Sequence, residues 1–327
     1  MFFKAAQQGG HQIWRYLLTI FCVILGFMLG QIPLSFIIYG EMADPETGIV
    51  DAHALEEFMA EPDFTTIGVN SNLAFLLVLF GFVGAAIGLW IGVSKIHGRP
   101  MLSVVTPKPR LDWAKMIFAF SLWLGLAFVM EMGMYLYNPG NYAFLEFNLS
   151  NYLVLILISL LVLPIQTSIE ELFVRGYLLQ GLGLATKVRW IPLLLTSMFF
   201  GMVHLDNPEV KEFGLGIMMT YYISVGLFLG MVTLMDDSLE LALGVHLATN
   251  LYGSMFVTFK GAAIQTDALA RLNETPLELM LPAYWLSVLI FVFICWKKYG
   301  WVNWLPKIFG PVDLVDEAPQ SDMASPN

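Results

Sequence analysis

Long apolar stretches recur along the whole chain, and this recurrence constrains the fold more than any other feature. An α-helix needs about 20 apolar residues to cross the ~30 Å hydrocarbon core of a bilayer. Stretches of that length recur between Leu17 and Trp296. Hydrophobic residues make up 57% of the 327 residues and charged residues only 13%, and the mean hydropathy is +0.71. A soluble protein of this length needs more polar surface, so the sequence predicts an all-α integral membrane protein.

Hydropathy predicts about eight transmembrane helices. The fifth is short, which favours a helix shielded by its neighbours, and Pro164 is expected to kink the long fourth helix. The expected spans are 17–39, 72–96, 116–136, 149–181, 190–204, 213–235, 239–259 and 277–296. Together they predict one transmembrane domain, residues 17–300, between an N-terminal segment (1–16) and a tail (301–327) expected to be disordered.

Lysine and arginine residues are concentrated in the loops on one side of this predicted bundle, and most of them lie between the second and third spans, after the fourth span, and after the last. Because cytoplasmic loops carry such an excess, both termini are expected to face the cytoplasm and the 41–63 loop the outside. The net charge is −10, with the acidic residues clustered in that loop and in the tail. This distribution predicts a lipid bilayer as the surroundings and no nucleic-acid partner.

Three charged residues interrupt the fourth predicted span, namely Glu170, Glu171 and Arg175. A charge at the centre of a membrane helix costs about 2.5–3.5 kcal/mol on insertion scales, so such residues usually serve a function, and a structural ion pair is the alternative. Glu171 and Arg175 are four residues apart on one helical face, which predicts an orienting salt bridge. Glu170 points to a different face and is predicted to be the reactive carboxylate.

Two further apolar spans carry a histidine. The fifth closes with Phe200 and His204, and the seventh contains His246 and Asn250, each pair four residues apart. A lone buried histidine is more often a core residue than a catalyst, but two of them together with Glu170 favour one shared site. At 1.5 Å per residue, Glu170, His204 and His246 fall within a ~10 Å slab near the bilayer midplane.

These residue types together suit the hydrolysis of a peptide bond. A carboxylate and an imidazole can take a proton from one water molecule, and a second histidine and an asparagine can donate hydrogen bonds to the developing oxyanion. Glu170, His204 and His246 are also acceptable zinc ligands, so zinc stays open as a cofactor, although the chain has no H-E-x-x-H motif. A proton-coupled carrier that uses the same side chains as a relay, or a non-catalytic membrane immunity or scaffold protein, is the alternative function.

Three motifs in this order, each on an apolar helix, give the chain a family resemblance. They are E-E-x-x-x-R (Glu170, Glu171, Arg175), F-x-x-x-H (Phe200, His204) and H-x-x-x-N (His246, Asn250), within residues 149–255. They resemble the motifs of the CPBP (Abi) family of intramembrane proteases, which is related to the type II CAAX prenyl endopeptidases.

This resemblance implies an intramembrane endopeptidase of the bacterial cytoplasmic membrane. Glu170 and His204 would activate the water, and His246 and Asn250 would stabilise the oxyanion. Glu171, Arg175 and Phe200 would support the site. A membrane-associated or lipid-modified protein is the implied substrate, with its identity left open.

Overall fold

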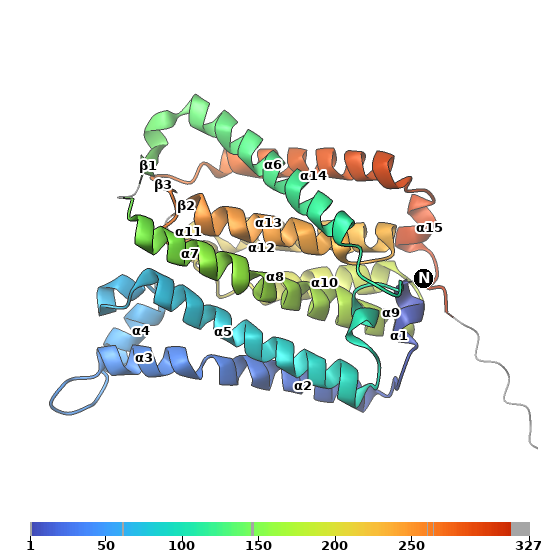
Figure 1. The fold of residues 1–327 in the computed structure, drawn as a ribbon, viewed down its shortest axis with the longest axis horizontal. Coiled ribbons are helices and arrows are strands. Elements are labelled where there is room, and N and C mark those ends of the chain that lie inside the picture. The colour runs from blue at the N-terminus through green and yellow to red at the C-terminus, as the bar shows by residue number, and fades with distance from the viewer. Residues whose placement is uncertain (1, 61, 145–146, 260, 264, 315–327) are drawn as a thin grey trace, which may run out of the picture.

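A computed structural model describes residues 2–60, 62–144, 147–259, 261–263 and 265–314 of the chain. Long helices lie side by side in one elongated bundle (Figure 1). The N-terminus, α1 (Phe2–Ala6) and α15 (Trp304–Phe309) lie at one end of the bundle, called here the α1 end. A small sheet lies at the opposite end, called here the sheet end (Figure 1).

Six helical segments in the described part of the chain are long and apolar enough to cross a membrane. They are Ile13–Met42, Ser71–Ile96, Trp113–Tyr137 (α6), Leu149–Thr186, Leu215–Asp236 (α12) and Leu277–Tyr299 (α14). The two other expected spans are helical but shorter, α10 (Trp190–Met202) and α13 (Glu240–Met255). The chain is therefore a mostly helical integral membrane protein, and the count of eight spans and the direction of the termini stay predictions.

Some of these segments are built from several consecutive helices. The first joins α2 (Ile13–Gly30) to α3 (Ile32–Met42), and the second joins α5 (Ser71–Trp90) to the π-helical turn η2 (Ile91–Ile96). The fourth joins α7 (Leu149–Leu161), α8 (Leu163–Glu171), the π-helical turn η5 (Leu172–Leu178) and α9 (Leu179–Thr186). It breaks at Val162, and Pro164 lies in the first turn of α8, where its missing N–H leaves no hydrogen bond unmade. Arg175 lies in η5, and π turns frequently occur at functional sites.

Glycines allow α2 and α5 to pack along most of their length. A Cβ atom added at Gly84 would meet the backbone carbonyl of Gly26, and one added at Gly26 would meet the carbonyl of Gly84. Small residues let two membrane helices approach to backbone contact in this way. The pair therefore depends on the absence of side chains at these two positions.

Short elements close the sheet end. The strands are β1 (Tyr142–Phe144), β2 (Val257–Phe259) and β3 (Ala270–Leu272), in the order β1-β3-β2. Tyr142 lies opposite Leu272 in the antiparallel pair, and Val257 lies opposite Ala270 in the parallel pair.

The remaining short helices are α4 (Ala52–Ala60), η1 (Phe64–Ile67), η3 (Met101–Val104), η4 (Pro139–Asn141) and α11 (Pro208–Phe213).

The first and the last described residues pack at the α1 end of the bundle. The rings of Phe2 and Phe3 are buried, and Gly183 of α9 leaves room for Phe3. The sequence predicts a disordered tail over residues 301–327, but Trp304–Phe309 of that tail form the helix α15. Beyond it, the backbone N–H of Val312 donates to the carbonyl of Lys187 at 2.9 Å. Residues 315–327 of that tail lie outside the described residues.

Candidate active site

His246 of α13 contacts both neighbouring glutamates of α8. Its Nδ1 lies 2.8 Å from Oε1 of Glu171, and its Nε2 lies 3.3 Å from Oε2 of Glu170. The side chains of consecutive helical residues point about 100° apart, so Glu170 and Glu171 leave α8 in different directions. The His246 ring reaches both carboxylates because α13 packs against α8 between these two directions. The first and third sequence motifs therefore meet at one imidazole.

These two contacts require an additional proton. A neutral imidazole has one N–H and one lone pair, whereas both ring nitrogens of His246 face carboxylate oxygens. Glu171 also accepts a hydrogen bond from Arg175, so it serves as an acceptor, and Nδ1 of His246 is the donor to it. The second contact, at 3.3 Å, is an ion pair when His246 also carries a proton on Nε2.

The predicted ion pair between Glu171 and Arg175 forms. Nη1 of Arg175 lies 2.7 Å from Oε1 of Glu171, and both side chains are fully buried. The guanidinium carbon of Arg175 lies 4.1 Å from the centre of the Phe200 ring, a cation–π contact. By contrast, the side chain of Glu170 is 20% exposed. Among the three charges of the motif, Glu170 is therefore the one accessible to a reactant.

Phe200 connects the second motif to the other two. Its ring centre lies 4.4 Å from that of His204 and 6.2 Å from that of His246. Nδ1 of His204 lies 2.6 Å from the carbonyl oxygen of Phe200, so this nitrogen carries the proton that is donated to it. Nε2 of a neutral His204 is then a proton acceptor. Glu170, His204 and His246, of the predicted catalytic residues, and the three predicted supporting residues thus form one connected group of side chains, which does not include Asn250.

Sequence reasoning missed Gln166 and Tyr222. The side-chain amide of Asn250 donates to Oε1 of Gln166 at 2.9 Å, and the Tyr222 ring stacks on His204 at 4.5 Å. Gln166 precedes Glu170 by four residues on the same apolar helix, which is the signal that could have identified it. Tyr222 gave no such signal, because a tyrosine is unremarkable in a membrane helix.

Zinc, left open by the sequence as a cofactor, gains no support from the placement of Glu170, His204 and His246. Within the described residues, no group of three or more His, Cys, Asp or Glu side chains could hold a metal ion. Both nitrogens of His246 face carboxylates, and Nδ1 of His204 faces a backbone carbonyl.

The fold and the site together define an integral membrane protein with a partly buried cluster of glutamates and histidines between its helices. Residues 149–252 match the family model described as type II CAAX prenyl endopeptidase Rce1-like. The uncharacterized protein YyaK of Bacillus subtilis (strain 168) is 30% identical over 258 residues, which cover 78% of this chain and 81% of that protein. No solved structure matches the chain.

The chain belongs to the Rce1-like family of type II CAAX prenyl endopeptidases, the CPBP or Abi family. Membership suggests a CAAX-type intramembrane protease, and it implies a protein substrate without identifying it.

Proposed function

We propose that this protein is an intramembrane endopeptidase that hydrolyses a peptide bond of a membrane-associated or lipid-modified protein. One observation carries the proposal. A single imidazole, that of His246, contacts both Glu170 and the buried Glu171–Arg175 pair, in a family of peptidases. The partly exposed Glu170 then has an imidazole partner and access to a reactant.

Glu170 and His204 activate the water in this mechanism. The substrate carbonyl oxygen replaces Glu170 as the acceptor from Nε2–H of His246, and this exchange frees the Glu170 carboxylate. Water then donates a hydrogen bond to Nε2 of His204 and one proton to Glu170. The water oxygen forms a bond to the carbonyl carbon, and the carbonyl electron pair moves to its oxygen.

His246 and Asn250 stabilise the tetrahedral intermediate. Nε2–H of His246 and the side-chain amide of Asn250 donate hydrogen bonds to the oxyanion. Glu171 keeps the proton on the His246 ring, Arg175 neutralises Glu171, and Gln166 fixes the amide of Asn250. Glu170 returns its proton to the amide nitrogen as the carbon–nitrogen bond breaks, which releases an amine and a carboxylic acid.

The test compares membrane peptides from cells that carry the wild-type protein, Glu170→Gln or His204→Gln. Both variants are expected to accumulate uncleaved forms of the same membrane peptides. Glu131→Gln is the matched control, because Glu131 is also an acid in a membrane helix but contacts Tyr142 at the sheet end. Its peptides are expected to match those of the wild type.

A folded Glu170→Gln protein with an unchanged peptide pattern would contradict the proposal. Loss of proton flux through proteoliposomes in the same variant would support a carrier instead.

A further inference from the structure

His204 lies beyond the regular part of its helix. α10 ends at Met202, and His204 follows in a turn. Val203 and Leu205, its two neighbours in the chain, are exposed. The second side-chain torsion of a histidine has broad, roughly two-fold minima, so the backbone alone does not fix the plane of the ring. Which ring nitrogen faces the Phe200 carbonyl therefore depends on the groups that contact the imidazole.

Tyr222 of α12 supplies one of these contacts. Its ring centre lies 4.5 Å from that of His204, with 27° between the ring planes, and the residue is 8% exposed. The two helices approach closely here, because Gly201 of α10 leaves room for Ile223 of α12. Stacking restricts the imidazole to its plane, and the hydrogen bond to the Phe200 carbonyl selects the orientation in which Nδ1 is the donor.

Asn207 anchors Tyr222 from the same turn that carries His204. The side-chain amide of Asn207 donates to the hydroxyl oxygen of Tyr222 at 3.1 Å, and its backbone N–H donates to the carbonyl of His204 at 3.2 Å. Asn207 immediately precedes α11, where an asparagine side chain usually accepts a hydrogen bond from the first turn of the helix. It makes no such cap hydrogen bond, and its side chain donates to Tyr222 instead.

These contacts form a closed cycle of three residues. The backbone of His204 holds Asn207, the amide of Asn207 holds the Tyr222 hydroxyl, and the Tyr222 ring stacks on the imidazole of His204. Rotation of the imidazole out of its plane therefore displaces a ring that is tied to the same turn of the chain.

We propose that Asn207 and Tyr222 are positioning residues for His204. They hold its ring so that Nδ1–H faces the Phe200 carbonyl and Nε2 stays available as a proton acceptor. This inference rests on the proposed function, in which Nε2 of His204 accepts a hydrogen bond from the water. A misplacement of about 1 Å can lower an enzymatic rate about 100-fold, so the position of this ring matters as well as its presence.

The first test observes the imidazole directly and needs no substrate. Nitrogen-15 NMR of the histidine rings is recorded for the full-length protein in nanodiscs at about pH 8, where a histidine of ordinary pKa is neutral. His204→Gln identifies the His204 signals among those of the five histidines. The wild type is expected to show the Nδ1-protonated tautomer alone. Tyr222→Leu is expected to show both tautomers, because the stacked ring no longer confines the imidazole plane.

The second test measures the ratio of cleaved to uncleaved membrane peptides in cells. Tyr222→Leu is expected to lower this ratio by about tenfold or more, because the imidazole loses its position. Tyr222→Phe and Asn207→Ala each remove one partner of the same hydrogen bond, and each is expected to lower the ratio about two- to tenfold. The double variant is expected to fall no lower than either single variant, because the two residues act through one bond.

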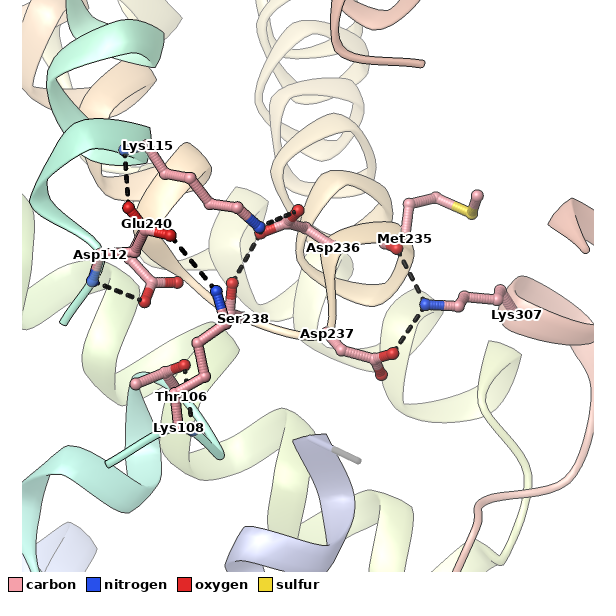
Figure 2. A network of polar contacts seen from close by, with 10 residues as sticks. All are labelled: Thr106, Lys108, Asp112, Lys115, Met235, Asp236, Asp237, Ser238, Glu240 and Lys307. Atoms are coloured by element: carbon pink, nitrogen blue, oxygen red, sulfur yellow. Dashed lines mark hydrogen bonds and ion pairs between the residues drawn. The ribbon is translucent and has the colours of Figure 1, made fainter. Parts of the chain in front are cut away.

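Lys307→Met is the control for a general loosening of α12. Lys307 donates hydrogen bonds to the carbonyl of Met235 and to Asp237 at the α1 end of that helix, far from Tyr222 (Figure 2). The variant is expected to unfold at a lower temperature but to keep the wild-type tautomer and the wild-type peptide ratio.

An Nε2-protonated His204 in the wild type would overturn the proposal, whether or not any variant folds. A folded Tyr222→Leu protein with the wild-type tautomer would do the same, as would a tautomer change in Lys307→Met or additive losses in the double variant. Failure of the proposed function gives a different result. His204→Gln would then leave the membrane peptides unchanged, while the tautomer of His204 would still depend on Tyr222.

Discussion

At the residue scale, the environment of each charge determines what its loss would do. The Glu171–Arg175 pair and the Lys108–Asp112 pair have the same four-residue spacing, but the first is fully buried and the second is 46% and 32% exposed at its two side chains. Exposed pairs contribute little, whereas a buried charge that loses its partner is strongly destabilising.

Arg175→Met is therefore expected to lower the free energy of unfolding by about 3–5 kcal/mol, because Glu171 stays buried without its cation. Lys108→Met, the exposed control, should cost less than about 1 kcal/mol. Thermal and denaturant unfolding in detergent measure both. Equal losses in the two variants would show that burial does not determine the contribution of this pair.

The sequence predicted those site contacts that are local. Glu171 and Arg175 lie one helical turn apart, so their pairing follows from helix geometry alone. The bridge from His246 to both glutamates could not be predicted, because it depends on how α13 is placed against α8. For the same reason the sequence predicted that Asn250 belongs to the site but did not predict its partner, Gln166.

At the element scale, glycine positions determine how closely membrane helices pack. Gly84→Val is expected to lower the free energy of unfolding by about 3 kcal/mol or more, because the new Cβ would meet the backbone of α2. Gly125→Val is the control, since a Cβ there would meet nothing within 4 Å. Unfolding temperatures of the two variants in the same detergent check this, and similar values would contradict the backbone contact.

His97 links the N-terminal segment to the bundle through two hydrogen bonds. Its Nδ1 donates to the carbonyl of Gly10 at 2.7 Å, and its Nε2 accepts from the hydroxyl of Tyr177 at 2.8 Å. Burial lowers the pKa of His97, and the nearby charge of Arg99 lowers it further, against the opposite effect of the Gly10 carbonyl. The packed segment therefore disfavours the imidazolium form.

The segment is expected to be fully packed above the ordinary histidine pKa of about 6.5 and to loosen as the pH falls below it. Hydrogen exchange of Phe2–Ala6, corrected for intrinsic rates, should increase between pH 7.5 and pH 5.5. His97→Gln should remove this pH dependence. If the variant keeps the same dependence, another group is responsible.

Helix positions were predictable from hydropathy, but only one of the interruptions in the helices was. The break near Pro164 was expected, because proline cannot continue the hydrogen-bond pattern. The sequence did not predict the π turns η2 and η5 or the burial of α1, because each depends on contacts with distant residues.

At the scale of the whole molecule, both described chain ends lie at the α1 end of the bundle (Figure 1). The distribution of Lys and Arg predicts that this end faces the cytoplasm. A fluorescent protein fused to the C-terminus should fluoresce, and an alkaline phosphatase inserted after Thr47, in the acidic loop, should be active. The reverse pattern for both reporters would invert the predicted orientation.

The position of the buried ion pair within one helix has a consequence for biosynthesis. Glu171 and Arg175 can neutralise each other as soon as their helix forms, before any other helix is present. The translocon would therefore receive this segment with one unpaired charge, Glu170, rather than three. Glu170 meets its partner only after α13, 70 residues later, has been synthesised and inserted. The carboxylate proposed to be reactive is thus the last of the three charged residues to meet its partner, and the segment reaches the bilayer before the proposed catalytic site is assembled.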